Sequence, residues 1–368
     1  MKKQYTLKGT VKNSNALVLK VPDEKRWNLN TWPRTENDLD VLVRHLSAGK
    51  YDLSNWCSPG NPSKNFILFT YKGFVYPYIV ASNVKGGKPN TILAPLEPTL
   101  LDSDTCLARN SNLDKFHPRS TLRIAVLGCG SLGSIVVELL ARAGLKSIDV
   151  IDKEDFESEN CSRHILGVSS ISESKVSELK QRIEREIPGA FVSGSKACAI
   201  DWLSKTDLSE YDFIVDCTGE SVVRSFLGGV AANQKLKAKI ILAWVEPFCA
   251  ASHYIFVAPP DVWPKSDPWD KVNLVFWPSN LEVNPCGRGF HPYGVSDVWQ
   301  AAGFVAEKIL ASIDANLEAS EIVSMVRSSS FIKNVCPEAK ITAQFPLFAD
   351  DVDVIRFSRS YYKTIYDE

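Results

Sequence analysis

From Thr121 onward, continuous apolar runs alternate with stretches whose apolar residues recur at helical spacing. The run 121–128 (TLRIAVLG) predicts a strand buried on both faces, and 131–145 (SLGSIVVELLARAGL) predicts the helix that follows it. The same alternation continues with strand-like runs at 146–152, 191–200, 211–219 and 238–246, and helix-like runs at 172–187 and 221–236. Such alternation is typical of a doubly wound, mostly parallel sheet, so the sequence predicts an α/β fold.

The first part of the chain has a different pattern. It contains short strand-like runs at 16–21, 66–71 and 74–81, and one helix-like stretch at 36–49 that ends in a glycine. This mixture predicts a smaller N-terminal α+β domain over residues 1–100. The polar stretch 101–120 is expected to be a linker or an arm that crosses a surface, which leaves 121–368 as the main domain.

The last third begins with a strand-like run at 251–260, followed by an irregular stretch rich in Trp and Pro at 259–294. Ser296 is expected to cap a helix that has Asp297 in its first turn and extends to about residue 313. A long loop before a helix is uncommon unless it has a role, so the loop 259–294 is expected to be functional.

Composition narrows the classes of partner. The 368 residues carry a formal net charge of -1, which gives no overall bias toward nucleic acid or an anionic membrane. No run of 18 apolar residues and no secretory leader is present, so a cytoplasmic protein without a membrane span is expected. The nine cysteines include no CxxC pair, and zinc is therefore not expected.

A glycine-rich turn lies between the first predicted strand and helix of the main domain. Gly128, Gly130 and Gly133 form GxGxxG, Ser131 opens the helix, and Asp152 ends the next strand. Glycines allow close backbone approach, a helix N-terminus offers N–H groups to phosphate, and the acid can accept from ribose hydroxyls. The glycines alone could serve only a tight strand–helix junction, but with strand, helix and acid in order they predict a nucleotide site.

The residues after Asp152 indicate which nucleotide binds. An ordinary dinucleotide site needs only the acid, whereas this chain adds Asn160, Arg163 and Lys175. Cations converging on several phosphates suit a triphosphate better than a dinucleotide, although a solvated surface pair is the alternative for Arg163 and Lys175.

These elements, in this order, carry a family resemblance. The stretch from Thr121 to about residue 310 resembles the ThiF/MoeB superfamily, whose fold is that of the ubiquitin-activating enzymes. The segments GCGSLGS, ENCSRHILG and GFHPYGVSDV look most like bacterial activating enzymes of ubiquitin-like conjugation operons, including those of CBASS antiphage systems. The stretch TWPRTENDLDVL resembles, more weakly, the region before the adenylation domain in the activating-and-conjugating fusions among them.

The resemblance implies an ATP-dependent adenylyltransferase that activates the C-terminal carboxylate of a ubiquitin-like or other partner protein. Asp152 would then hold the ribose, Asn160 and Arg163 would contact the triphosphate, Lys175 would steady the α-phosphate, and Mg²⁺ would bridge the phosphates. Family members usually dimerise through this domain, which implies a homodimer. Residues 1–120 show no conjugating domain, so a separate conjugating protein, or a longer fusion that contains this chain, is expected.

One position departs from the family pattern. Gly219, in the segment DCTGE, stands where the family often has a metal-binding Asp. Either Asp216 or Glu220 then holds Mg²⁺, and we favour Asp216 because the carboxyl ends of strands face the ligand in such sheets. The departure also leaves a non-catalytic scaffold open.

A nucleophilic cysteine is predicted in the long loop. Cys286 lies in NPCGRGFHPYG, in the region where bacterial relatives carry their reactive cysteine, and Arg288 and His291 could favour its thiolate. A thiol without chemistry is the alternative, and Cys161 and Cys249 are poorer candidates. His164 is expected to have a structural or phosphate-adjacent role, and His253 to be a core histidine.

Three other functions remain open beside a protein-activating enzyme. A peptide or sulfur-carrier adenylyltransferase is one, although such relatives commonly carry the CxxC zinc pair that this chain lacks. The others are the scaffold and an NAD-dependent oxidoreductase, which Asn160, Arg163 and Lys175 disfavour.

Overall fold

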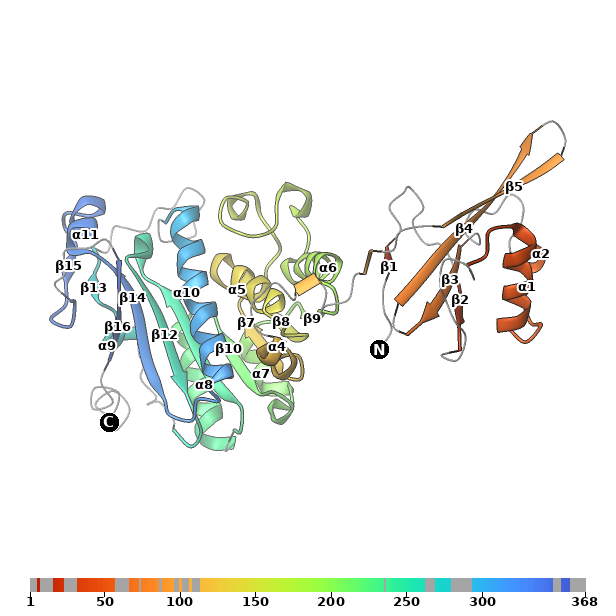
Figure 1. Ribbon diagram of the computed structural model, residues 1–368. Helices are drawn as coiled ribbons and strands as arrows, with labels where there is room; N and C mark the ends of the chain where they lie inside the picture. The colour runs from red at the N-terminus through yellow and green to blue at the C-terminus, as the bar shows by residue number, and fades with distance from the viewer. Residues whose placement is uncertain are drawn as a thin grey trace. The chain divides into compact units, whose positions relative to one another are not determined.

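The computed structural model describes most of the chain, which folds into two compact units, Met1–Cys106 and Leu107–Glu368 (Figure 1). The described residues are 5–6, 16–22, 32–56, 66–72, 74–85, 88–95, 99–100, 106–107, 113–234, 236–261, 269–278, 293–346 and 352–357.

The first unit is built on a mixed sheet with strand order β2-β3-β4-β5. β2 (Ala16–Lys20) runs parallel to β3 (Phe66–Tyr71), and β4 (Phe74–Lys85) and β5 (Lys88–Pro95) continue the sheet antiparallel. Helix α1 (Glu36–Leu46) and the short α2 (Leu53–Trp56) pack their apolar side chains into one core with β2, β3 and β4. A two-stranded pair, β1 (Tyr5–Thr6) with β6 (Thr99–Leu100), completes the described elements of this unit.

Helix α1 begins where its sequence supplies a capping box. The Thr35 hydroxyl accepts from the Asp38 amide at 3.1 Å, and the Asp38 carboxylate accepts from the Thr35 amide at 3.0 Å. Two N–H groups that a helix start leaves without partners are thereby satisfied. The helix ends before Gly49, whose φ of +79° is a conformation that few other residues adopt.

In the described part of the second unit, an eight-stranded sheet has the order β16-β14-β12-β11-β10-β7-β8-β9. The parallel part consists of β7 (Arg123–Leu127), β8 (Ser147–Ile151), β9 (Phe191–Ser195), β10 (Phe213–Asp216) and β11 (Lys239–Val245). An antiparallel extension adds β12 (Ala251–Val257), β14 (Glu321–Arg327) and β16 (Val352–Arg356).

Helices cover both faces of this sheet (Figure 1). α5 (Ser131–Arg142), α6 (Lys175–Glu186) and α10 (Val295–Asp314) share one buried core with the sheet. α7 (Ala199–Lys205) and α8 (Ser221–Gln234) share the core on the other face. The predicted doubly wound, mostly parallel α/β fold is therefore confirmed, because the two apolar faces of its strands are each covered by helices.

Smaller elements lie beyond the antiparallel edge of the sheet. They are α9 (Trp269–Val272), β13 (Val275–Phe276) paired with β15 (Lys340–Ile341), and α11 (Ser329–Val335). The described helices include none with the length and apolar content needed to cross a bilayer.

Several local predictions differ from the structure. Residues 113–119, expected to lie in an arm, form helix α4 (Leu113–Arg119), because Phe116 is buried and Arg119 pairs with Asp314 at 2.6 Å. The second half of the run 191–200 leads into α7. The predicted cap at Ser296 is wrong: α10 begins after Gly294, whose amide donates to the Asp297 carboxylate at 3.1 Å.

A buried carboxylate fixes the segment that follows β12 along the chain. Glu246, at the end of β11 and fully buried, accepts from the amides of Leu274 at 2.7 Å and Val275 at 3.2 Å. It also accepts from the Trp277 indole at 3.1 Å and lies 2.9 Å from Nε2 of His253. His253 is thus a core histidine, as expected, and one acidic side chain organises four surrounding groups.

We expect Glu246→Ala to lower the free energy of unfolding by about 3 kcal/mol or more, because the donors around the lost carboxylate stay buried without an acceptor. Denaturant unfolding followed by circular dichroism measures this loss. The control is Glu307→Ala, whose carboxylate side chain is 71% exposed, with an expected change within about 0.5 kcal/mol. Equal stability of the two variants would contradict an organising role for Glu246.

Candidate nucleotide site

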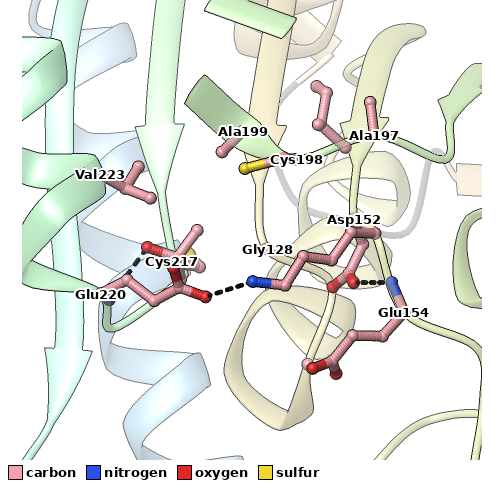
Figure 2. Close-up of a pocket in the computed structure, with 13 residues that line it drawn as sticks. Gly128, Asp152, Glu154, Ala197, Cys198, Ala199, Cys217, Glu220 and Val223 are labelled. Atoms are coloured by element: carbon pink, nitrogen blue, oxygen red, sulfur yellow. Dashed lines mark hydrogen bonds and ion pairs between the residues drawn. The ribbon is translucent and has the colours of Figure 1, made fainter. Parts of the chain in front are cut away.

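A pocket lies at the carboxyl ends of β7, β8, β9 and β10, the edge at which doubly wound sheets bind their ligands (Figure 2). Its empty volume is about 560 Å³, part of which is open solvent. Its lining residues are Gly128, Gly130, Ile151, Asp152, Lys153, Glu154, Ala197, Cys198, Ala199, Cys217, Thr218, Glu220 and Val223. Ala197, Cys198 and Ala199, which the sequence did not single out, also line the pocket.

The turn between β7 and α5 needs its glycines. Gly128 has φ +82°, and a Cβ there would lie 2.8 Å from the backbone of Thr218. A Cβ at Gly133 would lie 2.0 Å from the Gly128 carbonyl oxygen. Gly130 instead meets open space and precedes α5 without a side-chain cap, so the N–H groups at the start of α5 can serve an anion.

Asp152 lies in the pocket with its carboxylate held by the backbone. One oxygen accepts from the Cys129 amide at 2.7 Å, and the other accepts from the Glu154 amide at 2.8 Å. Burial raises the pKa of Asp152 above its usual value, while these two hydrogen bonds oppose the rise. The acid therefore joins the glycine turn to the end of β8 and keeps lone pairs for a ligand hydroxyl.

Lys175, the first residue of α6, is paired with an acid that the sequence left without a firm role. Its Nζ lies 2.6 Å from the Glu154 carboxylate, with the Lys175 side chain 4% exposed and that of Glu154 48% exposed. Lys175 does not itself line the pocket, but its charge lowers the pKa of Asp152, which does.

Asn160 and Arg163 do not line the pocket of Figure 2. Asn160 ends a 3₁₀ turn, Ser158–Asn160, and its side-chain oxygen accepts from the Glu157 amide at 3.0 Å. The Arg163 guanidinium lies 4.7 Å from the centre of the Tyr293 ring, and the Tyr293 hydroxyl lies 2.6 Å from that of Ser131. Arg163 is thus connected to the start of α5 through Tyr293, which sequence reasoning missed.

His164 ties the Arg163 segment to the glycine turn. Its Nε2 donates to the Cys129 carbonyl at 2.7 Å, and its Nδ1 accepts from the Leu166 amide at 3.0 Å. This arrangement requires the neutral ring, and burial lowers the pKa of His164 to about 4. The expected structural role fits these contacts.

An ion pair crosses the pocket. Lys153 Nζ lies 3.2 Å from the Glu220 carboxylate, joining the segment after β8 to the segment after β10 (Figure 2). Both side chains are about half exposed, so the pair contributes little to stability and a ligand can separate it at small cost.

Two carboxylates near Gly219, those of Asp216 and Glu220, are the candidate ligands of the predicted Mg²⁺. Asp216 is buried and does not line the pocket; one oxygen accepts from the Thr218 amide and hydroxyl, and the other has no hydrogen-bond partner among the described residues. Burial raises the pKa of Asp216 to about 6. Glu220, the alternative ligand, does line the pocket. Within the described chain no three acidic, His or Cys side chains cluster as a metal site, so phosphate oxygens would have to complete the coordination.

The predicted nucleophile Cys286, with Arg288 and His291, lies outside the described residues. Cys249 is buried, which raises the pKa of its thiol well above the usual value, and Cys161 is partly buried. Neither placement resembles that of a reactive thiolate, which needs exposure and nearby positive charge.

The doubly wound fold and the pocket at the carboxyl ends of its strands are those expected of a nucleotide-binding α/β unit. Comparison with known proteins narrows the class further. Residues 110–247 match the model of the ThiF family, which confirms the resemblance found in the sequence. The chain is 29% identical over 192 residues to the ATP-dependent ubiquitin transferase-like protein Cap2 of Enterobacter hormaechei subsp. hoffmannii, a match that covers 49% of this chain and 31% of the relative.

A second relative is the adenylyltransferase and sulfurtransferase MOCS3 of Mus musculus, 31% identical over 137 residues, with 35% of this chain and 29% of the relative covered. The chain thus spans less than a third of the length of these curated relatives. Among solved structures, E. coli MccB with succinimide has a TM-score of 0.48 at 13% identity, covering 66% of this chain and 64% of that one.

We expect the second unit to lose stability as the pH falls from about 6.5 toward about 4, partly through His164. In that window the unfolded histidine binds a proton that the folded one excludes, so this contribution is present above pH 6.5 and lost through pH 4. The measurement compares the pH dependence of unfolding with that of His164→Gln, which cannot titrate. Parallel curves for the two proteins would contradict a neutral His164.

Proposed function

We propose that this chain is an ATP-dependent adenylating enzyme that activates the C-terminal carboxylate of a ubiquitin-like or other partner protein. The observation that carries the proposal is that two cations are tied to one glycine turn. Lys175 pairs with Glu154, whose amide donates to Asp152 beside the turn, and Arg163 reaches Ser131 through Tyr293. The names of the Cap2 and MOCS3 relatives, which specify ATP-dependent transfer and adenylyl transfer, support the same chemistry.

Each residue has a distinct part in this proposal. Asp152 accepts from the ribose hydroxyls, and the N–H groups at the start of α5 receive phosphate oxygens. Lys175 leaves Glu154 for the α-phosphate, an exchange that is cheap because the Glu154 side chain is 48% exposed and regains water. Asn160 and Arg163 contact the outer phosphates. The partner's carboxylate oxygen attacks the α-phosphorus, the bond to the β-phosphate breaks, and pyrophosphate leaves with the negative charge.

Mg²⁺, when bound, would neutralise charge on the leaving phosphates. Two acids near Gly219 fit this role: Asp216 offers a buried oxygen without a partner among the described residues, and Glu220 faces the pocket. Asp216 remains the predicted ligand, and Glu220, the alternative, is the one that already lines the pocket. A non-catalytic scaffold is the second candidate function, favoured by Gly219 in place of a carboxylate.

The later steps extend the same proposal. Cys286 would accept the acyl group from the adenylate as a thioester, releasing AMP, and a separate conjugating protein would then receive it. A homodimer is the proposed assembly.

We expect Arg163→Ala and Lys175→Ala each to lower the rate of ATP–pyrophosphate exchange roughly 100-fold, because each removes a cation from developing phosphate charge. The assay contains candidate partner proteins with a free C-terminal glycine. Lys196→Ala is the control, since this half-exposed lysine pairs with Asp155 outside the pocket lining and should leave exchange unchanged. If no partner supports exchange and ATP does not bind, the result supports the non-catalytic scaffold. Binding of NADH would instead support the NAD-dependent oxidoreductase.

We expect the wild-type protein to form a DTT-sensitive covalent adduct with the activated partner, and Cys286→Ala to abolish that adduct while exchange continues. Non-reducing electrophoresis after incubation with ATP measures it. Cys106→Ala, which removes an exposed thiol of the first unit, is the matched control. An adduct that persists in Cys286→Ala would reject Cys286 as the acceptor.

A further inference from the structure

We infer that Tyr293 is a positioning residue that holds Arg163 beside the start of α5 and so makes the site prefer a triphosphate over a monophosphate. The inference rests on the proposed function, because it assigns Arg163 to the outer phosphates.

Tyr293 makes two different contacts with two separate elements. Its ring faces the Arg163 guanidinium at 4.7 Å, within the range of a cation–π interaction. Its hydroxyl lies 2.6 Å from the hydroxyl of Ser131, the first residue of α5. Tyr293 therefore braces the arginine against the helix start at which the phosphates are expected.

Tyr293 is itself held in place by its surroundings. The Tyr293 ring packs against the core shared by α5, α6 and α10. The next residue, Gly294, donates to Asp297 at 3.1 Å, and Asp297 also pairs with Arg327 of β14 at 3.4 Å. Helix α10 packs along α5, so the tyrosine and the helix start that it touches belong to one rigid layer (Figure 1). An arginine on a flexible stem loses less conformational entropy on binding when a fixed ring already restrains its head group.

This geometry separates the effects on different nucleotides. A monophosphate needs Asp152 for its ribose and the start of α5 for its single phosphate. A triphosphate also extends to Arg163, whose guanidinium the Tyr293 ring faces at 4.7 Å. Loss of the ring should therefore weaken the binding of ATP but not that of AMP, whereas general damage to the fold would weaken the binding of both.

The test is calorimetric titration of the full chain with ATP and with AMP. Tyr293→Ala should weaken ATP binding roughly 5- to 30-fold, the scale of a partly desolvated cation–π contact, and change AMP binding less than about twofold. Tyr293→Phe keeps the ring but removes the hydroxyl, and it should weaken ATP binding roughly 2- to 5-fold, the scale of one hydrogen bond. Phe191→Ala, which removes a ring facing Lys180 at 5.4 Å on the exposed side of β9, is the matched control and should change neither.

A double-mutant cycle guards against a folding artefact. If Tyr293 acts through Arg163, Tyr293→Ala should weaken ATP binding little further in an Arg163→Ala background. Equal losses for ATP and AMP, or full additivity with Arg163→Ala, would overturn the inference while leaving nucleotide binding intact. A wild-type chain that binds neither nucleotide would instead reject the proposed function, and this inference with it.

Discussion

The turn between β7 and α5 packs against the segments that follow β8 and β10, and the candidate site depends on that packing. Gly128 approaches Thr218 at the end of β10, Gly133 approaches Gly128 itself, and the Cys129 amide is hydrogen-bonded to Asp152 at the end of β8. Because three neighbouring parallel strands end at the same edge, these contacts fix the positions of the ribose acid, the helix start and the segment after β10 together. A side chain at Gly128 or Gly133 would move all of them.

Charged residues form pairs around this centre, and a bound nucleotide can exchange the two pairs that include the lining residues Lys153 and Glu154. Consecutive residues after β8 each have a partner: Lys153 pairs with Glu220, Glu154 with Lys175 and Asp155 with Lys196. The acids in these pairs are about half exposed, so water replaces a lost lysine at small cost. Lys175 is buried, and it would stay poorly solvated without Glu154 or a phosphate beside it. This contrast keeps the lysine oriented before any ligand arrives.

Two further residues each join segments that are distant in the sequence. Glu246 at the end of β11 holds the amides of Leu274 and Val275, and Tyr293 before α10 holds Ser131 and Arg163. Glu246 fixes a segment beyond the antiparallel edge of the sheet, whereas Tyr293 acts beside the glycine turn. Asp297 in the first turn of α10 pairs with Arg327 of β14, so the antiparallel extension contacts the helix that Tyr293 precedes.

The sequence by itself determined the α/β fold, the glycine turn and Asp152, because these depend on local patterns: apolar runs, helical spacing, and glycines between a strand and a helix. It also singled out Lys175 and Arg163 by their order after Asp152. Their roles remain predictions. Only the tertiary structure decided that Glu154 pairs with Lys175, that Glu220 and not Asp216 lines the pocket, and that Tyr293 joins Arg163 to Ser131. Those contacts join residues from 21 to 162 positions apart, and no local pattern records which strand ends meet at one edge of a sheet.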